Sequence, residues 1–342
     1  MTIKRILGMT IALAALAGVA AAALSLTGAG ATFPYPMYSK WFSDYHKMHG
    51  DIEINYQSIG SGGGIKQVTE GTVDFGATDG PMNDEQLAEF KAKRGCDVLH
   101  FPTVMGAVVP TYNVPGVTGE LNFTAEALAS IFLGKITKWN DPEIASANAG
   151  VKLPNNDVVV VHRSDGSGTT FIWVDFLAKV SPEWKTKVGV KTSVNWPVGL
   201  GGKGNEGVAG QVKQTENSIG YVELIYAVQN KMSYGKVKNP AGVFVKADLA
   251  SVTAAAAGAA ANMPEDFRVS ITNAPGKDAY PISSFTWLLV PNKFQDPAKK
   301  KAVTEFLTWM LGPGQAQGAA LSYAPLPKAV VAKEIKAISK IQ

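Results

Sequence analysis

The chain has 342 residues and a formal net charge of +4, from 32 Lys and Arg against 28 Asp and Glu. A net charge this small argues against an extended nucleic-acid or membrane-binding surface. The only cysteine, Cys96, excludes an intrachain disulfide, and the length allows one large domain or two ordinary ones. Cys96 is expected to be a free, partly buried thiol, with an intermolecular or reactive thiol as the alternative.

The first residues have the pattern of a secretory signal peptide. Lys4 and Arg5 precede a short apolar run, which ends in the small residues Ala21 and Ala23 that a signal peptidase accepts. We therefore predict a cleaved signal at 1–23 and a secreted protein, with an N-terminal membrane anchor as the alternative. No other stretch of the sequence is long and apolar enough to span a bilayer.

Beyond the signal, short β-rich runs alternate with helical patterns. The patterns predict strands at 52–57, 72–77, 158–163 and 283–291, and helices at 65–71, 83–95, 253–262 and from Asp296 and Pro297 to about Leu311. Asn83 or Asp84 is expected to cap the helix at 83–95, and Gly95 to end it. The alternation predicts an α/β fold with largely parallel sheets.

Three stretches rich in glycine and hydroxyl residues stand before expected helix starts, at 27–34, 58–64 and 165–171. A helix N-terminus offers unpaired N–H donors and a partial positive charge, so it can bind an oxyanion without lysines. Three such ends facing one point could surround a tetrahedral anion. The alternative is ordinary helix capping by Thr32, Ser61 and Ser167.

The motifs of common catalytic sites are missing from the sequence. No Gly-Lys pair has the spacing of a phosphate-binding P-loop, and the serine-hydrolase pattern GxSxG does not occur. GLGGKG at 199–204 matches a dinucleotide-binding pattern, but no first strand precedes it. His46 and His49 lack the acid of a zinc-protease motif. From these missing motifs together we predict no metal site, no cofactor and no catalytic residue.

Four sequence blocks resemble the periplasmic phosphate-binding proteins of bacterial phosphate-specific ABC transporters. These blocks are LTGAGATFPYPMYSKW, NYQSIGSGGGIKQVTEGTVDFGATDGPM, RSDGSGTTF and WPVGLGGKGNEGVAG. The similarity runs in order from about Leu26 to beyond Tyr221 and resumes weakly at DAYPISSFTWLLV. FKAKRGCD at 90–97 looks like an insertion. The resemblance implies two α/β lobes of the class II binding-protein type, each with a mixed sheet flanked by helices and with phosphate in the cleft between them.

The resemblance also implies the site residues and the lobes. The positions that match the family's phosphate-contacting residues are Thr32, Phe33, Ser61, Asp79, Arg163, Ser167, Gly168 and Thr169. Gly62 and His162 depart from residues common in the family, a serine and an arginine. We expect the chain to cross between lobes near Asn113 and Pro281. Lobe I would then comprise 24–113 and 281–342, and lobe II 114–280.

Two aspartates in these motifs are expected to do different work. Asp165 stands two residues from Arg163, close enough to hold its guanidinium with paired hydrogen bonds. The alternative is an aspartate that bonds its own backbone in a turn. Asp79 would face the ligand, where a carboxylate can accept a hydrogen bond only from a protonated anion such as phosphate. The alternative is that Asp79 only caps the helix at 83–95.

The sequence thus predicts a periplasmic phosphate receptor that is not an enzyme. Its lobes would close over the anion, and it would deliver phosphate to the transmembrane subunits of an ABC permease, whose energy comes from a separate ATPase. One alternative is a receptor for sulfate or molybdate, which Asp79 opposes. The other is a secreted phosphatase with Ser167 or Thr169 as nucleophile, which the missing partner base opposes.

Overall fold

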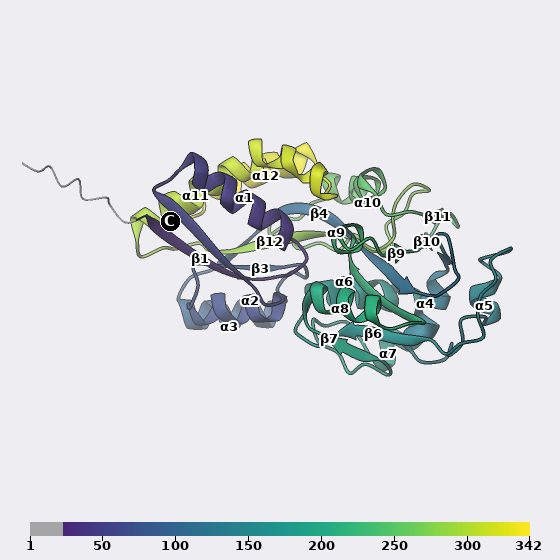
Figure 1. The fold of residues 1–342 in the computed structure, drawn as a ribbon. Coiled ribbons are helices and arrows are strands. Elements are labelled where there is room, and N and C mark those ends of the chain that lie inside the picture. The colour runs from purple at the N-terminus through teal and green to yellow at the C-terminus, as the bar shows by residue number, and fades with distance from the viewer. Residues whose placement is uncertain (1–22) are drawn as a thin grey trace, which may run out of the picture.

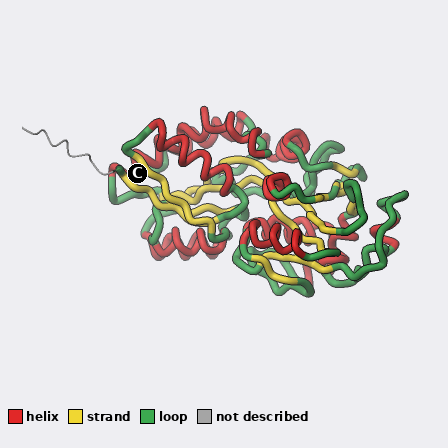
Figure 2. Tube along the Cα trace, viewed as in Figure 1, coloured by secondary structure: helices red, strands yellow, loops and turns green. Residues whose placement is uncertain are grey.

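The computed structural model describes residues 23–342 (Figure 1). Apart from its last residue, the predicted signal peptide lies outside this range. Helices cover both faces of a long twisted sheet, and the molecule has two lobes side by side (Figures 1 and 2). No helix within 23–342 combines the length and apolar character that a membrane span requires.

The first lobe is built on three parallel strands in the order β2-β1-β3. These strands are β1 (Leu24–Gly30), β2 (Ile52–Ser58) and β3 (Phe75–Thr78). Each is followed by a helix, namely α1 (Tyr35–Met48), α2 (Ser61–Glu70) and α3 (Asp84–Arg94). The carboxyl ends of the strands and the starts of α1 and α2 therefore lie at one edge of the sheet, which is where ligands collect in α/β folds.

One long strand, β4 (Val98–Asn113), carries the sheet from one lobe to the other, and β12 (Ser283–Pro291) lies beside its first part. β12 pairs antiparallel with β3 and with the first part of β4. The last part of β4, at 108–113, pairs antiparallel with β8 (Ser218–Glu223). The strand order is β2-β1-β3-β12-β4-β8, and β6 (Val159–Arg163) and then β7 (Leu200–Gly202) continue it.

The second lobe repeats the strand–helix pattern. β6 (Val159–Arg163) lies parallel to β8 and to β7 (Leu200–Gly202). The helices of this part of the chain are α4 (Ala125–Phe132), α5 (Pro142–Ala145), α6 (Gly168–Val180), α7 (Pro182–Lys187), α8 (Gly204–Gln214) and α9 (Leu224–Gln229). The short strands are β5 (Asn122–Phe123), β9 (Ser233–Tyr234), β10 (Lys236–Lys238) and β11 (Phe244–Val245).

After β11 the chain forms three further α-helices, one 3-10 helix and β12, with a long connection without helix or strand between α10 (Leu249–Ala261) and β12. The other helices are α11 (Pro297–Leu311), the 3-10 helix η1 (Pro313–Leu321) and α12 (Lys328–Ile338). Helices α11 and α12 lie with α1 on one face of the first lobe, whereas α2 and α3 cover the other (Figure 1). Met37 and Phe42 of α1 are buried in the resulting core, each contributing roughly 1.5–3 kcal/mol.

Most of the predicted elements are confirmed. The strand at 283–291 has the predicted limits, and α3 has Asn83 as its cap and Gly95 in a left-handed conformation after its last residue. The expected strand at 72–77 begins only at Phe75. Largely parallel sheets were the wrong expectation for the middle of the molecule, because β12 and β4 run antiparallel to their neighbours. The predicted division into 24–113 with 281–342 and 114–280 stays a prediction.

Candidate functional site

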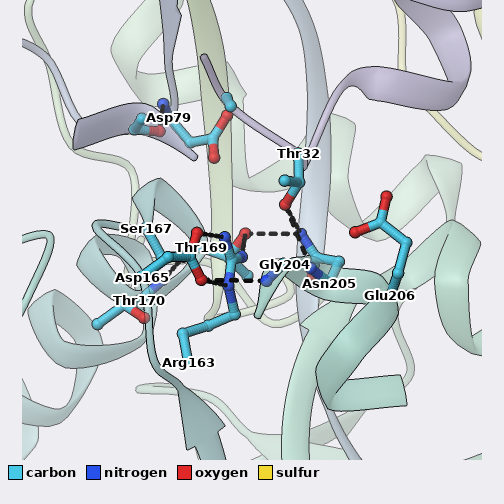
Figure 3. Close-up of polar contacts among 12 residues, drawn as sticks. Thr32, Asp79, Arg163, Asp165, Ser167, Thr169, Thr170, Gly204, Asn205 and Glu206 are labelled. Carbon is cyan, nitrogen blue, oxygen red and sulfur yellow. Dashed lines mark hydrogen bonds and ion pairs between the residues drawn. The ribbon is translucent and has the colours of Figure 1, made fainter. Parts of the chain in front are cut away.

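The sequence-predicted site residues come together where strands end and helices begin. Thr32 and Phe33 lie between β1 and α1, Ser61 starts α2 and Asp79 follows β3. From the other side, Arg163 ends β6, Ser167 caps α6, and Gly168 and Thr169 begin it. Figure 3 shows Arg163, Ser167 and Thr169. The side chains are closed off from solvent, with exposures of 2% or less for Thr32, Phe33, Ser61, Asp79, Arg163, Ser167 and Thr169.

The two sets of residues are in direct contact. The N–H of Gly62 donates to the carbonyl of Gly166 at 2.9 Å, which joins the starts of α2 and α6. A Cβ atom on Gly168 would lie 2.3 Å from Ser61 Oγ and 2.5 Å from Asp79 Oδ2. Gly168 is therefore required by close approach, and the structure is a closed form.

Asp79 is a buried carboxylate with one free oxygen. Its Oδ1 accepts a hydrogen bond of 2.8 Å from Thr286 Oγ1, while its buried Oδ2 has no partner among residues 23–342. Burial raises the Asp79 pKa to about 7, against the opposing effects of the Thr286 hydrogen bond and the charge of Arg163. An unpartnered oxygen in a buried site is costly, so it marks a position where a donor from outside the chain would be stabilised.

Arg163 is held in place by Asp165. Its Nε donates to Asp165 Oδ1 at 2.8 Å and its Nη2 to Asp165 Oδ2 at 2.5 Å, so the predicted paired contact is present. Burial alone would raise the Asp165 pKa, but the hydrogen bonds and charge of Arg163 outweigh it and the pKa is lowered. Asp165 also accepts from the N–H of Gly204 at 3.0 Å, which ties Arg163 to the start of α8 (Figure 3).

Helix capping explains only one of the three hydroxyl residues. Ser167 caps α6 by accepting from the N–H of Thr170 at 3.0 Å. Ser61 caps no helix and instead accepts from the N–H of Asp79 at 3.2 Å. Thr32 is not the cap of α1, which follows Pro34. The capping alternative for Asp79 is also wrong, because Asn83 caps α3.

Two residues of the site were missed by the sequence reasoning. Asn205, in the second position of α8, donates from Nδ2 to Thr32 Oγ1 at 2.7 Å and to Thr169 Oγ1 at 3.0 Å (Figure 3). Thr286 reaches Asp79 from β12. Asn205 stands inside the block WPVGLGGKGNEGVAG, and Thr286 stands inside DAYPISSFTWLLV, where the similarity is weaker. These two stretches were the available signals.

The motifs that suggested other chemistry lie apart from this arrangement. His46 and His49 are exposed at the end of α1. Between residues 23 and 342, no group of three or more His, Cys, Asp and Glu side chains is placed to hold a metal ion. GLGGKG forms β7 and the start of α8, and Cys96 is a free, partly buried thiol.

Comparisons with known proteins agree with the fold and the motifs. A family profile described as the PBP superfamily domain matches residues 16–313. The phosphate-binding protein PstS of Xylella fastidiosa (strain Temecula1) is 50% identical over 315 residues, which cover 92% of this chain and 84% of the relative. That of Pasteurella multocida is 47% identical over 312 residues, with 91% and 89% covered. The chain belongs to the family of PstS phosphate-binding proteins.

Solved structures of more distant proteins share the fold of this family. A high-affinity periplasmic phosphate-binding protein called PfluDING, bound with phosphate, matches with a TM-score of 0.72 and 23% identity over 91% of this chain and 93% of the other. A phosphate-binding protein from Stenotrophomonas maltophilia matches with a TM-score of 0.69 and 20% identity, with 92% and 94% covered. The predicted two-lobed α/β fold of a periplasmic binding protein is confirmed.

Proposed function

We propose that this protein binds inorganic phosphate in the periplasm and delivers it to the inner-membrane permease of a phosphate ABC transporter. The proposed contact residues are Thr32, Phe33, Ser61, Asp79, Arg163, Ser167, Gly168 and Thr169, with Asp165 holding Arg163. The family is one of binding proteins, so the chain is not an enzyme.

The observation that carries this proposal is the pairing of one free carboxylate oxygen with a set of donors. Arg163, the hydroxyls and the start of α6 can donate to the oxygens of an anion, whereas Asp79 Oδ2 can accept a hydrogen bond. Phosphate near neutral pH has both kinds of group, because it keeps at least one proton. Sulfate carries no proton at this pH, so it would place an oxygen lone pair against the Asp79 carboxylate.

The free energy of the hydrogen bond to Asp79 is large enough to give strong selectivity for a protonated anion. A hydrogen bond to a charged group adds about 1.5–3 kcal/mol, and leaving a buried carboxylate unpaired costs a similar amount. Losing the bond and adding a repulsion would give discrimination on the order of 10⁴ against an unprotonated anion. This argument opposes the sulfate or molybdate receptor more than it opposes an arsenate receptor.

The phosphatase alternative finds little support in the surroundings of its two candidate nucleophiles. Ser167 accepts a backbone N–H, and Thr169 contacts Arg163 and Asn205, all of which are donors rather than bases. A nucleophilic hydroxyl needs a neighbouring base to take its proton. Binding without turnover is therefore the function that these contacts favour.

Delivery to a permease and export to the periplasm are supported by less direct observations. The basic and apolar pattern at 1–23 is typical of a cleaved signal. Binding proteins of ABC transporters hand their ligand to transmembrane subunits, and the resemblance of the four motif blocks implies such a partner here. Closure of the two lobes would provide the form that the permease receives.

The proposal is tested by calorimetric titration of the mature protein, unfolded, dialysed and refolded to remove bound anion. We expect one phosphate per chain, no heat with sulfate, and no turnover of a chromogenic phosphate ester with or without a divalent metal. Absence of phosphate binding would contradict the receptor, and ester turnover above background would favour the phosphatase.

A further inference from the structure

Asn205 joins the hydroxyl of Thr32, which follows β1, to the hydroxyl of Thr169, which lies at the start of α6. Its side chain is fully buried, and its Nδ2 donates to Thr32 Oγ1 and to Thr169 Oγ1 at 2.7 and 3.0 Å. Its own Oδ1 accepts from the backbone N–H of Glu223 at 2.9 Å. That bond fixes the amide, because the oxygen must face the Glu223 N–H and the NH₂ group must face the threonines.

Each threonine oxygen receives a second N–H as well. Thr32 Oγ1 accepts from the backbone N–H of Asn205 at 3.3 Å, and Thr169 Oγ1 accepts from Arg163 Nη1 at 3.3 Å. The amide NH₂ and the guanidinium can only donate, so these contacts cannot reverse. A hydroxyl oxygen has two lone pairs and one hydrogen, and here both lone pairs are occupied.

Each of these two hydroxyls can form one further hydrogen bond, in which its hydrogen is donated. In the part of the chain that the structure describes, neither the Thr32 nor the Thr169 hydroxyl donates to a protein acceptor. Both hydrogens are therefore available for a bound anion, and neither oxygen can accept from one. A hydroxyl without these neighbours could rotate and either donate a hydrogen bond to the anion or accept one from it.

We infer that Asn205 is a positioning residue that fixes the polarity of Thr32 and Thr169, making both hydroxyls obligatory donors to the bound anion. This inference rests on the proposed function, because the anion is the phosphate proposed above. It leaves Asp79 Oδ2 as the acceptor among these side chains, so the site takes an anion with one proton to give. Asn205 also links the β1–α1 connection to α8, so the donors are aligned only when the site is closed.

The inference predicts that Asn205 acts on phosphate through the two hydroxyls. We would measure the phosphate affinity of wild type, Asn205→Ala, the Thr32→Val/Thr169→Val pair and the triple variant by calorimetry. In the wild-type background, Asn205→Ala should weaken phosphate binding about tenfold. In the Thr32→Val/Thr169→Val background, the same substitution should weaken it less than about threefold. A residue that only supported the fold would weaken binding by the same factor in both backgrounds.

Two controls keep the outcomes distinct. Asn148 is also buried, with Nδ2 bonded to the carbonyls of Asn122 and Ile144, so Asn148→Ala should lower the unfolding temperature without changing phosphate affinity. Thermal unfolding of each ligand-free variant confirms that it folds. Equal effects of Asn205→Ala in the two backgrounds would overturn the inference and leave the receptor intact. No phosphate binding by wild type would overturn both.

Discussion

Asp165 holds the guanidinium of Arg163 through two hydrogen bonds, at 2.8 and 2.5 Å, in a site where the arginine is almost fully buried. This pairing explains why an aspartate stands in a loop whose glycines, hydroxyls and arginine suit an anion. The carboxylate fixes the arginine and also neutralises part of its charge. These two effects on a bound phosphate have opposite signs.

We therefore predict that Asp165→Asn changes phosphate affinity by less than about tenfold, or about 1.4 kcal/mol. The variant loses the rigid hold on Arg163 but leaves more of its positive charge for the ligand. The ligand-free protein should unfold at a lower temperature, because Arg163 loses its buried partner. Calorimetry measures the phosphate affinity and thermal unfolding measures the stability. A loss of phosphate affinity above a hundredfold would contradict the prediction and show that the orientation of Arg163 matters more than its charge.

The raised pKa of Asp79 predicts a pH-dependent closure of the ligand-free protein. The pKa is about 7 in the closed site, against an ordinary value of 3.8 when the carboxyl is solvated. The closed form thus holds the proton more tightly, so the closed fraction should rise as the pH falls through 7 and stop changing below about 4. Across this pH range the free energy of closure should change by about 4 kcal/mol.

Small-angle scattering of the ligand-free protein measures this closure as a smaller radius of gyration at low pH. The matched variant is Asp79→Asn, which has the same shape and no titrating group. Its radius should not depend on pH in this range. The same pH dependence in wild type and variant would assign the effect to another group.

Gly168→Ala tests the close approach of α6 to the residues of the first lobe. The added methyl would fall within 2.3 Å of Ser61 Oγ, so the closed form must open slightly and lose contacts with the ligand. Phosphate affinity should fall about ten- to a hundredfold. Gly210→Ala is the control, because a Cβ there meets no atom within 4 Å. Equal affinity in the two variants would contradict the closed geometry.

The sequence could predict the parts of the site that depend on short motifs. Arg163 and Asp165 are two residues apart, and Ser167 to Thr169 follow at once at a helix start, so local spacing places them together. Thr286 and Asn205 reach the site through the pairing of β12 with β3 and through the position of α8, and the spacing of neighbouring residues does not predict those contacts.

The limits of α2 show why some boundaries could not be predicted. The helix begins at Ser61, inside a glycine run whose low helix propensity favours a loop. A Cβ on Gly64 would lie 2.5 Å from Gly30 Cα and 2.7 Å from the Ala77 carbonyl. The glycines thus let the helix pack directly on β1 and β3, and this packing outweighs propensity.

The most direct test of proton recognition by Asp79 is a titration of wild type and Asp79→Asn with phosphate and sulfate, above pH 7, where the carboxyl is ionised. We expect wild type to bind phosphate and give no heat with sulfate, and Asp79→Asn to gain sulfate binding, because its amide can donate where the carboxylate could only accept. Sulfate binding by wild type as tight as phosphate binding would contradict this role of Asp79.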